Sequence, residues 1–278
     1  MRIDAHHHFW RPARGDYGWL EQAPSTIVRD FLPGDLAPLL AARGIDRTIL
    51  VQAAPSEAET HFLLDLAAET PFVAGVVGWV DFEAPDAALR VRAAAARPGL
   101  VGLRPMVQDL ADDAWLARSE LDPVFEALVE TGLRFDALVR PRQLPALLKR
   151  IARNPQLKVV IDHGAKPEIA SGPFAAFEAW GRAMRGLAET GAYCKLSGLV
   201  TEASEDWRVD DLRPYADLLI KAFGPGRLMW GSDWPVLNLN GDYLAWSDAA
   251  DRLMEGLSAD DRGRVRGGAA AEFYGVRA

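Results

Sequence analysis

Two patterns of apolar and polar residues alternate along the chain. Short apolar runs, such as residues 48–52, are typical of strands that are buried on both faces. Between them apolar residues recur every three or four positions, as at Leu36, Leu39 and Leu40, where Gly44 then ends the helical pattern. The patterns predict strands at 2–10, 48–52, 72–80, 100–103, 134–139, 157–161, 193–196 and 228–230, and helices at 35–43, 56–69, 85–96, 122–131, 141–153, 173–190 and 212–223, with further helical patterns after residue 230.

Alternating strands and helices predict a parallel sheet with right-handed crossovers. Eight such units in about 250 residues favour a closed (β/α)8 barrel of the TIM type, built as one domain over residues 1–278. An open, doubly wound sheet is the alternative, but the glycine-rich phosphate loop that often accompanies it follows none of the strands. Residues 11–32 lack periodicity, and a loop of this length is expected to lie over the active-site mouth.

Composition narrows the classes of partner. The net charge is −8 without a cluster of Lys and Arg, so nucleic acid is not an expected partner. No run approaches the ~18 apolar residues of a membrane span, and the N-terminus does not resemble a signal peptide. The single cysteine, Cys194, excludes an internal disulfide and favours a reducing compartment, the cytoplasm. Assembly into a homo-oligomer stays open.

In a barrel of this type the active site lies at the carboxyl ends of the strands. His6 and His8 share one face of the first strand, whereas His7 points to the other face and is expected to pack under a helix. Helical His61 is expected to be structural. The polar residues at strand ends are His6, His8, Gln52, Asp81, Arg104, Asp136, His163, Lys166, Lys195, Ser197 and Asp233.

For some of these residues a structural role is the alternative to a role in the site. The sequence leaves two roles open for Gln52, Asp81 and Asp136: they either belong to the site or cap neighbouring backbone. Tryptophans at strand ends, Trp10 and Trp234 among them, could stack on a sugar ring.

Five segments carry a family resemblance: Ile-Asp-Ala-His-His-His-Phe-Trp at 3–10, Gly-Leu-Arg-Pro at 102–105, Asp-His-Gly-Ala-Lys-Pro at 162–167, Cys-Lys-Leu-Ser-Gly at 194–198 and Gly-Ser-Asp-Trp-Pro at 231–235. In this order they resemble the amidohydrolase superfamily, and more closely its lactonase branch, which contains hydrolases of L-fucono- and L-rhamnono-lactones. The resemblance implies a distorted (β/α)8 barrel and hydrolysis at a carbonyl group. His6 and His8 match the family's first-strand pair, His163 its mid-barrel histidine and Asp233 its last-strand aspartate.

We therefore expect a hydrolase that opens the lactone ring of a sugar acid. Asp233 is the expected general base and can return the proton to the leaving oxygen. His163 and Lys195 are the other expected catalytic residues. The expected substrate-binding residues are Arg104, Lys166, Trp10, Trp234 and Asp81. A metal-dependent decarboxylase of the same superfamily and a non-catalytic binding barrel are the alternatives.

The expected metal ligands are His6, His8, His163 and Asp233, which suffice for one zinc-like ion with an open water position. Binuclear members of the superfamily need a bridging carboxylated lysine near the end of the fourth strand, where this chain has Arg104. At most one divalent ion is therefore expected, with zinc favoured, and whether turnover needs it stays open.

Overall fold

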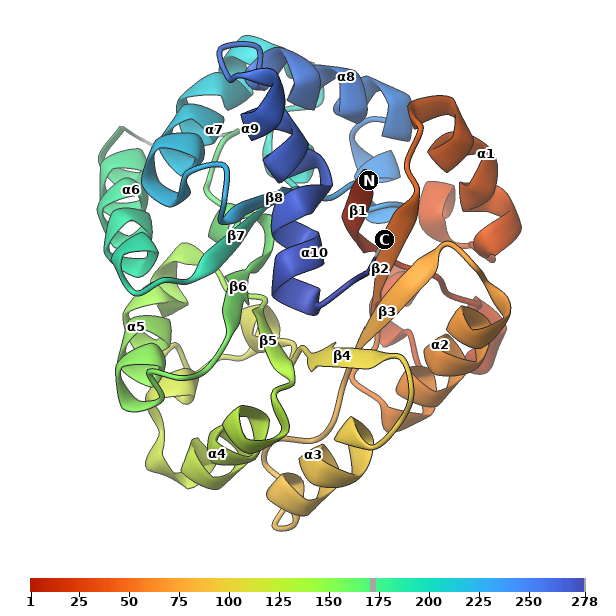
Figure 1. Ribbon diagram of the computed structural model, residues 1–278, viewed down its shortest axis with the longest axis vertical. Coiled ribbons are helices and arrows are strands. Elements are labelled where there is room, and N and C mark those ends of the chain that lie inside the picture. Colours follow the sequence, from red (N-terminus) through yellow and green to blue (C-terminus); the bar gives the residue numbers. More distant parts are fainter. Residues whose placement is uncertain (171–173, 278) are drawn as a thin grey trace.

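The computed structural model describes residues 1–170 and 174–277. Eight parallel strands pair in sequence order, and helices surround them on the outside (Figure 1). This arrangement confirms the predicted (β/α)8 barrel. The strands are β1 (Ile3–His7), β2 (Arg47–Val51), β3 (Val73–Gly78), β4 (Leu100–Leu103), β5 (Arg134–Ala137), β6 (Val159–Ile161), β7 (Tyr193–Leu196) and β8 (Leu228–Trp230).

The helices follow the predicted order, with differences at their starts. They are α1 (Pro33–Arg43), α2 (Glu57–Glu69), α3 (Ala87–Ala95), α4 (Asp122–Thr131), α5 (Leu144–Arg153), α6 (Phe174–Glu189), α7 (Val209–Phe223), α8 (Tyr243–Leu253), α9 (Ala259–Gly263) and α10 (Ala269–Tyr274). α7 begins earlier than predicted because the Asp211 carboxylate accepts a hydrogen bond of 2.7 Å from the Arg208 amide. The predicted helix start at Pro173 lies outside the described residues.

The barrel closes where β1 meets the segment after β8. The His8 amide donates to the Trp234 carbonyl at 2.7 Å, and the Asp233 amide donates to the His6 carbonyl at 2.8 Å. Gly231 permits this approach, because a Cβ there would lie 2.8 Å from the Cβ of His6. Closure thus places the first-strand histidines directly beside Asp233.

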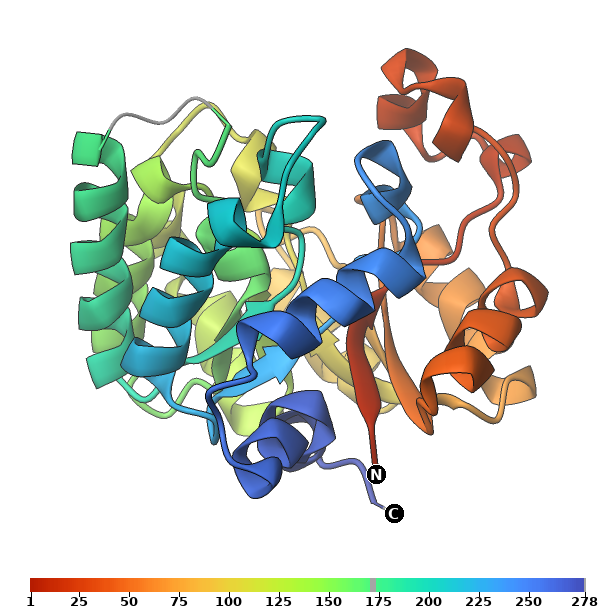
Figure 2. The ribbon, with the colours of Figure 1, turned by 90° about the horizontal axis from the view of Figure 1, so that it is seen from above.

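The two ends of the barrel differ. At the amino end, α10 lies across the barrel and buries Ala270 and Phe273 against inward-facing strand residues such as Ile3 and Met229 (Figure 1). The opposite end carries the short 3₁₀ turns of residues 11–32, which Figure 2 shows on the far side of the barrel from α10. No described helix has both the length and the apolar character that crossing a bilayer requires.

Candidate active site

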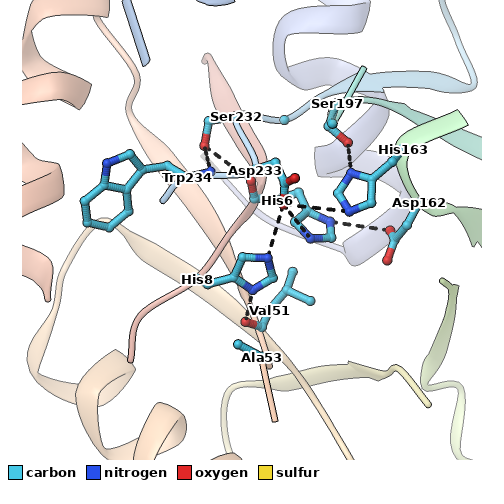
Figure 3. A network of polar contacts seen from close by, with 12 residues as sticks. His6, His8, Val51, Ala53, Asp162, His163, Ser197, Ser232, Asp233 and Trp234 are labelled. Atoms are coloured by element: carbon cyan, nitrogen blue, oxygen red, sulfur yellow. Dashed lines mark hydrogen bonds and ion pairs between the residues drawn. The ribbon is translucent and has the colours of Figure 1, made fainter. Parts of the chain in front are cut away.

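Asp233 lies at the centre of a buried cluster of three histidines (Figure 3). Its Oδ1 atom is 3.2 Å from His8 Nε2, 3.7 Å from His163 Nε2 and 3.8 Å from His6 Nε2. β1 and the residue after it supply His6 and His8, whereas His163 follows β6 and Asp233 follows β8. Four of the strand-end residues predicted from the sequence therefore meet at one point.

The backbone at two of these residues is held in an uncommon conformation. Asp233 has a φ of 59°, and His163 begins a run of four left-handed residues, 163–166, with φ between 50° and 61°. Non-glycine residues in this region cost ~1–3 kcal/mol each and cluster at functional sites. Here the conformation turns both side chains inward over the barrel end (Figure 3).

Burial sets the charge of the cluster. It lowers the pKa of His163 to about 4, although Asp233 opposes the shift, and it lowers the pKa of His8 and of His6 as well. Burial alone would raise the pKa of Asp233, but in acid, where their rings are protonated, His163 through its charge and His8 through a hydrogen bond outweigh it and hold that pKa below its ordinary value. At neutral pH an ionised carboxylate therefore faces three neutral imidazoles.

This donor set fits a single metal ion. His8 Nδ1 lies 2.8 Å from the Val51 carbonyl oxygen, which can only accept, so the neutral ring carries its proton there. The lone pair of His8 Nε2 then faces Asp233 Oδ1, and two acceptors at this distance call for a cation between them. The separations of 3.2 to 3.8 Å also resemble the ~3.3 Å between ligands of a tetrahedral zinc ion with bonds of ~2.0–2.1 Å. Ser197 Oγ, 2.8 Å from His163 Nδ1, orients that ring in the way typical of metal-binding histidines.

Arg104 brings a fixed positive charge to the same place. Its Nη2 and Nε atoms donate to Gln52 Oε1 at 2.8 and 3.2 Å, and Nη2 also contacts the Gln52 carbonyl. Its Nη1 atom is 3.4 Å from both Asp162 Oδ2 and His6 Nε2. Gln52 also donates from Nε2 to the carbonyls of Ala54 and Arg104 at 3.3 and 3.2 Å, so it both bonds neighbouring backbone and orients the Arg104 side chain.

Lys195 lies beneath the histidines and is fully buried. Its ammonium is 2.5 Å from Asp136 Oδ2, 2.9 Å from Asp162 Oδ1 and 3.1 Å from His6 Nδ1. The two carboxylates that could bind a second cation are thus already paired with Lys195. The sequence did not single out Asp162, and its place directly before His163 was the available signal.

The ring proton of His6 depends on this neighbour. When Lys195 donates to His6 Nδ1, the proton of the neutral ring lies on Nε2, towards Asp233; when Arg104 Nη1 donates to Nε2 instead, that proton lies on Nδ1. His6 can join His8 and Asp233 around an ion only when that proton moves to Nδ1, which is 3.4 Å from Asp162 Oδ1. His6 is therefore the ligand whose role is most sensitive to its surroundings.

A pocket of about 300 Å³ opens above the cluster. Lys166 lies at its edge with Nζ 3.3 Å from Glu202 Oε1. Trp19 forms part of its wall and donates from Nε1 to the Ala53 carbonyl at 2.8 Å. The lining residues are His8, Trp19, Ala53, Arg104, Met106, Gln108, Asp109, Leu138, His163, Lys166, Asp233, Val236 and Leu239. Sequence reasoning missed Trp19 because it lies in the aperiodic segment 11–32.

Three predicted substrate-binding residues lie elsewhere. The buried indole of Trp10 donates to the carbonyls of Ile27 and Arg29 at 3.2 and 3.0 Å, which anchors the loop. Trp234 points away from the histidines in Figure 3. Asp81 accepts from the Glu83 amide at 2.9 Å, which is a local turn contact. Their place at strand ends was predicted correctly, but their side chains do not line the pocket.

The remaining histidines lie outside the site. His7 is buried on the outer side of the strand, with Nε2 2.8 Å from Thr48 Oγ1. His61 is exposed on α2. Neither side chain lines the pocket.

Known proteins resemble the chain over its whole length. An L-fucono-1,5-lactonase of Burkholderia ambifaria is 48% identical over 284 residues, which cover 99% of this chain and 96% of that protein. An L-fucono-1,5-lactonase of Burkholderia multivorans is 40% identical, with coverage of 99% and 96%. The crystal structure of an amidohydrolase from Burkholderia multivorans with bound zinc superimposes with a TM-score of 0.93, at 40% identity and with 100% of both chains covered.

The family model described as amidohydrolase matches residues 3–276, nearly the entire chain. This match agrees with the barrel and with the histidines and aspartate at its carboxyl end. The chain belongs to the amidohydrolase family.

Proposed function

We propose that the protein hydrolyses the ring ester of a sugar-acid lactone, with L-fucono-1,5-lactone as the leading candidate. The observation that carries the proposal is the likeness over 99% of the chain to two L-fucono-1,5-lactonases. A pocket of about 300 Å³ is at the small end of the ~300–1,000 Å³ range of ligand sites and suits a monosaccharide. A decarboxylase of the same superfamily has less support, because the relatives named above that are 40% or more identical across the chain are lactonases.

Asp233 acts as the general base. Its ionised carboxylate lies at the floor of the pocket, where it takes a proton from the attacking water while the water oxygen bonds to the lactone carbonyl carbon. The bond between that carbon and the ring oxygen then breaks. Asp233 returns the proton to the ring oxygen, and the product is an open-chain hydroxy acid.

Arg104 stabilises the negative charge that develops on the carbonyl oxygen. Gln52 and Asp162 hold its guanidinium before substrate binds, so little reorganisation is needed during the reaction. Removal of one donor to an oxyanion costs ~10²–10³ in kcat in other hydrolases. We expect a loss of this order when Arg104 is replaced.

The metal proposal is at most one divalent ion, with zinc favoured, held by His6, His8 and Asp233, whose ligand atoms converge, with His163 beside Asp233 as a fourth ligand. His6 takes part when its ring proton lies on Nδ1. Such an ion, when bound, supplies Lewis-acid charge and acidifies a coordinated water. Arg104 supplies charge at the same end of the pocket, so the ion is not the sole source of positive charge there.

Trp19 and Lys166 are the proposed contacts to the rest of the sugar. Trp19 is 37% exposed as a residue and forms part of the pocket wall, where its ring can stack on a pyranose. The Lys166 ammonium can donate to substrate hydroxyls or to the product carboxylate. Through Trp19 the segment 11–32 covers one side of the pocket.

A panel of aldonolactones tests the proposal. Acid release is followed with a pH indicator on L-fucono-1,5-lactone, L-rhamnonolactone and hexonolactones that carry a hydroxymethyl group, with spontaneous opening subtracted. Asp233→Asn is the matched control for protein-dependent turnover. Amides, phosphate esters and CO2 release from aromatic acids are measured in parallel. An inert lactone panel with activity on any of these other substrates would overturn the proposal.

A further inference from the structure

A line of buried polar contacts runs from the active site to the opposite end of the barrel. Tyr274, the last residue of α10, donates from its hydroxyl to Asp136 Oδ2 at 2.6 Å. The same oxygen accepts from Lys195, which reaches His6. These links join α10 at the amino end to the histidine cluster at the carboxyl end.

The surroundings make the Tyr274 contact strong. Asp136 and Lys195 are fully buried, and Tyr274 is nearly so, within an apolar cluster that contains Val160 and Met229. A hydrogen bond to a charged group gains strength where water is excluded. Burial and the neighbouring Asp136 also raise the pKa of Tyr274 well above its ordinary value, so the hydroxyl keeps its proton and donates.

Asp136 has few other donors. Among the described residues, its Oδ1 atom has no hydrogen-bond partner. Loss of the Tyr274 hydroxyl would leave this carboxylate with Lys195 alone. The Lys195 ammonium also lies 5.6 Å from the centroid of the Tyr274 ring. Without the hydroxyl it would shift towards Asp136.

Movement of Lys195 acts on His6. An ammonium has three N–H donors, and three acceptors surround this one: Asp136 Oδ2, Asp162 Oδ1 and His6 Nδ1. A shift towards Asp136 weakens the contact of 3.1 Å with His6 Nδ1. The ring proton of His6 can then move to Nδ1, next to Asp162, and away from Asp233.

We propose that Tyr274 is a positioning residue of the active site, whose hydroxyl fixes the orientation and ring proton of His6 through Asp136 and Lys195. The kinetic part of this inference rests on the proposed lactonase function. It makes the C-terminal helix a part of the catalytic apparatus, although Tyr274 does not line the pocket.

Tyr274→Phe tests the proposal, because it removes the hydroxyl and keeps the ring. Tyr193→Phe is the matched control: Tyr193 also packs against α10, with ring centroids 4.8 Å apart from Phe273, and its hydroxyl donates to Glu272, away from Asp136. Loss of a residue that orients a site residue from outside the site typically lowers activity by ~10–100-fold. We expect kcat of Tyr274→Phe to fall at least tenfold with KM within about twofold of wild type, and both constants of Tyr193→Phe to stay near wild type.

A second readout does not depend on turnover. Imidazole ¹⁵N resonances report which ring nitrogen carries the proton, and the His6 signals are assigned by their loss in His6→Asn. We expect them to move in Tyr274→Phe and to stay in place in Tyr193→Phe. If Tyr274→Phe does not fold, Asp136→Asn is measured instead with the same expectations.

Two results would overturn the inference: unmoved His6 signals with wild-type kcat, or equal losses in both tyrosine variants, which would mean general loosening of α10. A wild-type protein inactive on every lactone would instead refute the proposed function, and the ¹⁵N comparison could still be read.

Discussion

Lys195→Met replaces a buried ammonium with an apolar side chain of similar length. In the native protein the ammonium lies 2.5 Å from Asp136 and 2.9 Å from Asp162, and all three side chains are fully buried. Among residues 1–170 and 174–277, the substitution leaves Asp136 with the Tyr274 hydroxyl as its one donor and leaves Asp162 with Arg104 and His6. Loss of the Lys195 ammonium therefore leaves a buried carboxylate charge without its cation.

The cost of this loss can be estimated. Removal of one member of a buried ion pair typically lowers the free energy of unfolding by ~3–5 kcal/mol. At ~2–4 °C per kcal/mol for a protein of this size, Tm should fall by roughly 6–20 °C. Scanning calorimetry or thermal unfolding followed by circular dichroism measures the shift. Adding Asp136→Asn should recover part of it, because the double variant no longer buries the unpaired carboxylate.

Lys166→Met is the matched control. The Lys166 side chain is 14% exposed, and its ammonium pairs with Glu202 at 3.3 Å at the edge of the pocket. An ion pair that water can reach contributes only ~0–1 kcal/mol, so its Tm should stay within about 4 °C of wild type. Equal Tm values for the two lysine variants would refute the buried-cation account of Lys195.

Three further predictions concern activity and metal. Asp233→Asn cannot take a proton, so kcat should fall by ~10² or more while circular dichroism shows an intact fold; near-normal turnover would exclude Asp233 as the base. Elemental analysis should find at most one divalent ion per chain, because Lys195 pairs with the carboxylates that a second ion would need; activity before and after chelation then decides whether the ion is required, and two tightly held ions would contradict the assignment. Trp19→Ala should raise KM for the lactone about tenfold with a smaller change in kcat, since stacking of the sugar ring on the indole affects binding, and an unchanged KM in steady-state assays would remove Trp19 from the binding site.

Several features of this protein follow from the sequence alone, because they depend on residues close together in the chain. The alternation of apolar runs with helical patterns predicted the barrel, and the alternation of side chains along a strand placed His6 and His8 on one face. In a barrel all strands end at the same rim, which is why the strand-end position of Asp233 already indicated the site.

Tertiary structure alone decided which strand-end residues meet and how deep each one lies. His8 and Asp233 are 225 positions apart, and only closure of the barrel brings them to 3.2 Å. Lys195 lies within β7 rather than after it, so its ammonium lies beneath the pocket, while Lys166 follows a turn and reaches the pocket edge.

Trp10 and Trp234 follow strands as predicted but turn into the core, whereas Trp19 reaches the pocket from a segment without a pattern. Tyr274 reaches the network from the other end of the barrel. Local pattern specifies the elements and the rim, but side-chain depth and long-range contacts depend on how distant segments pack, and that information is spread over the whole chain.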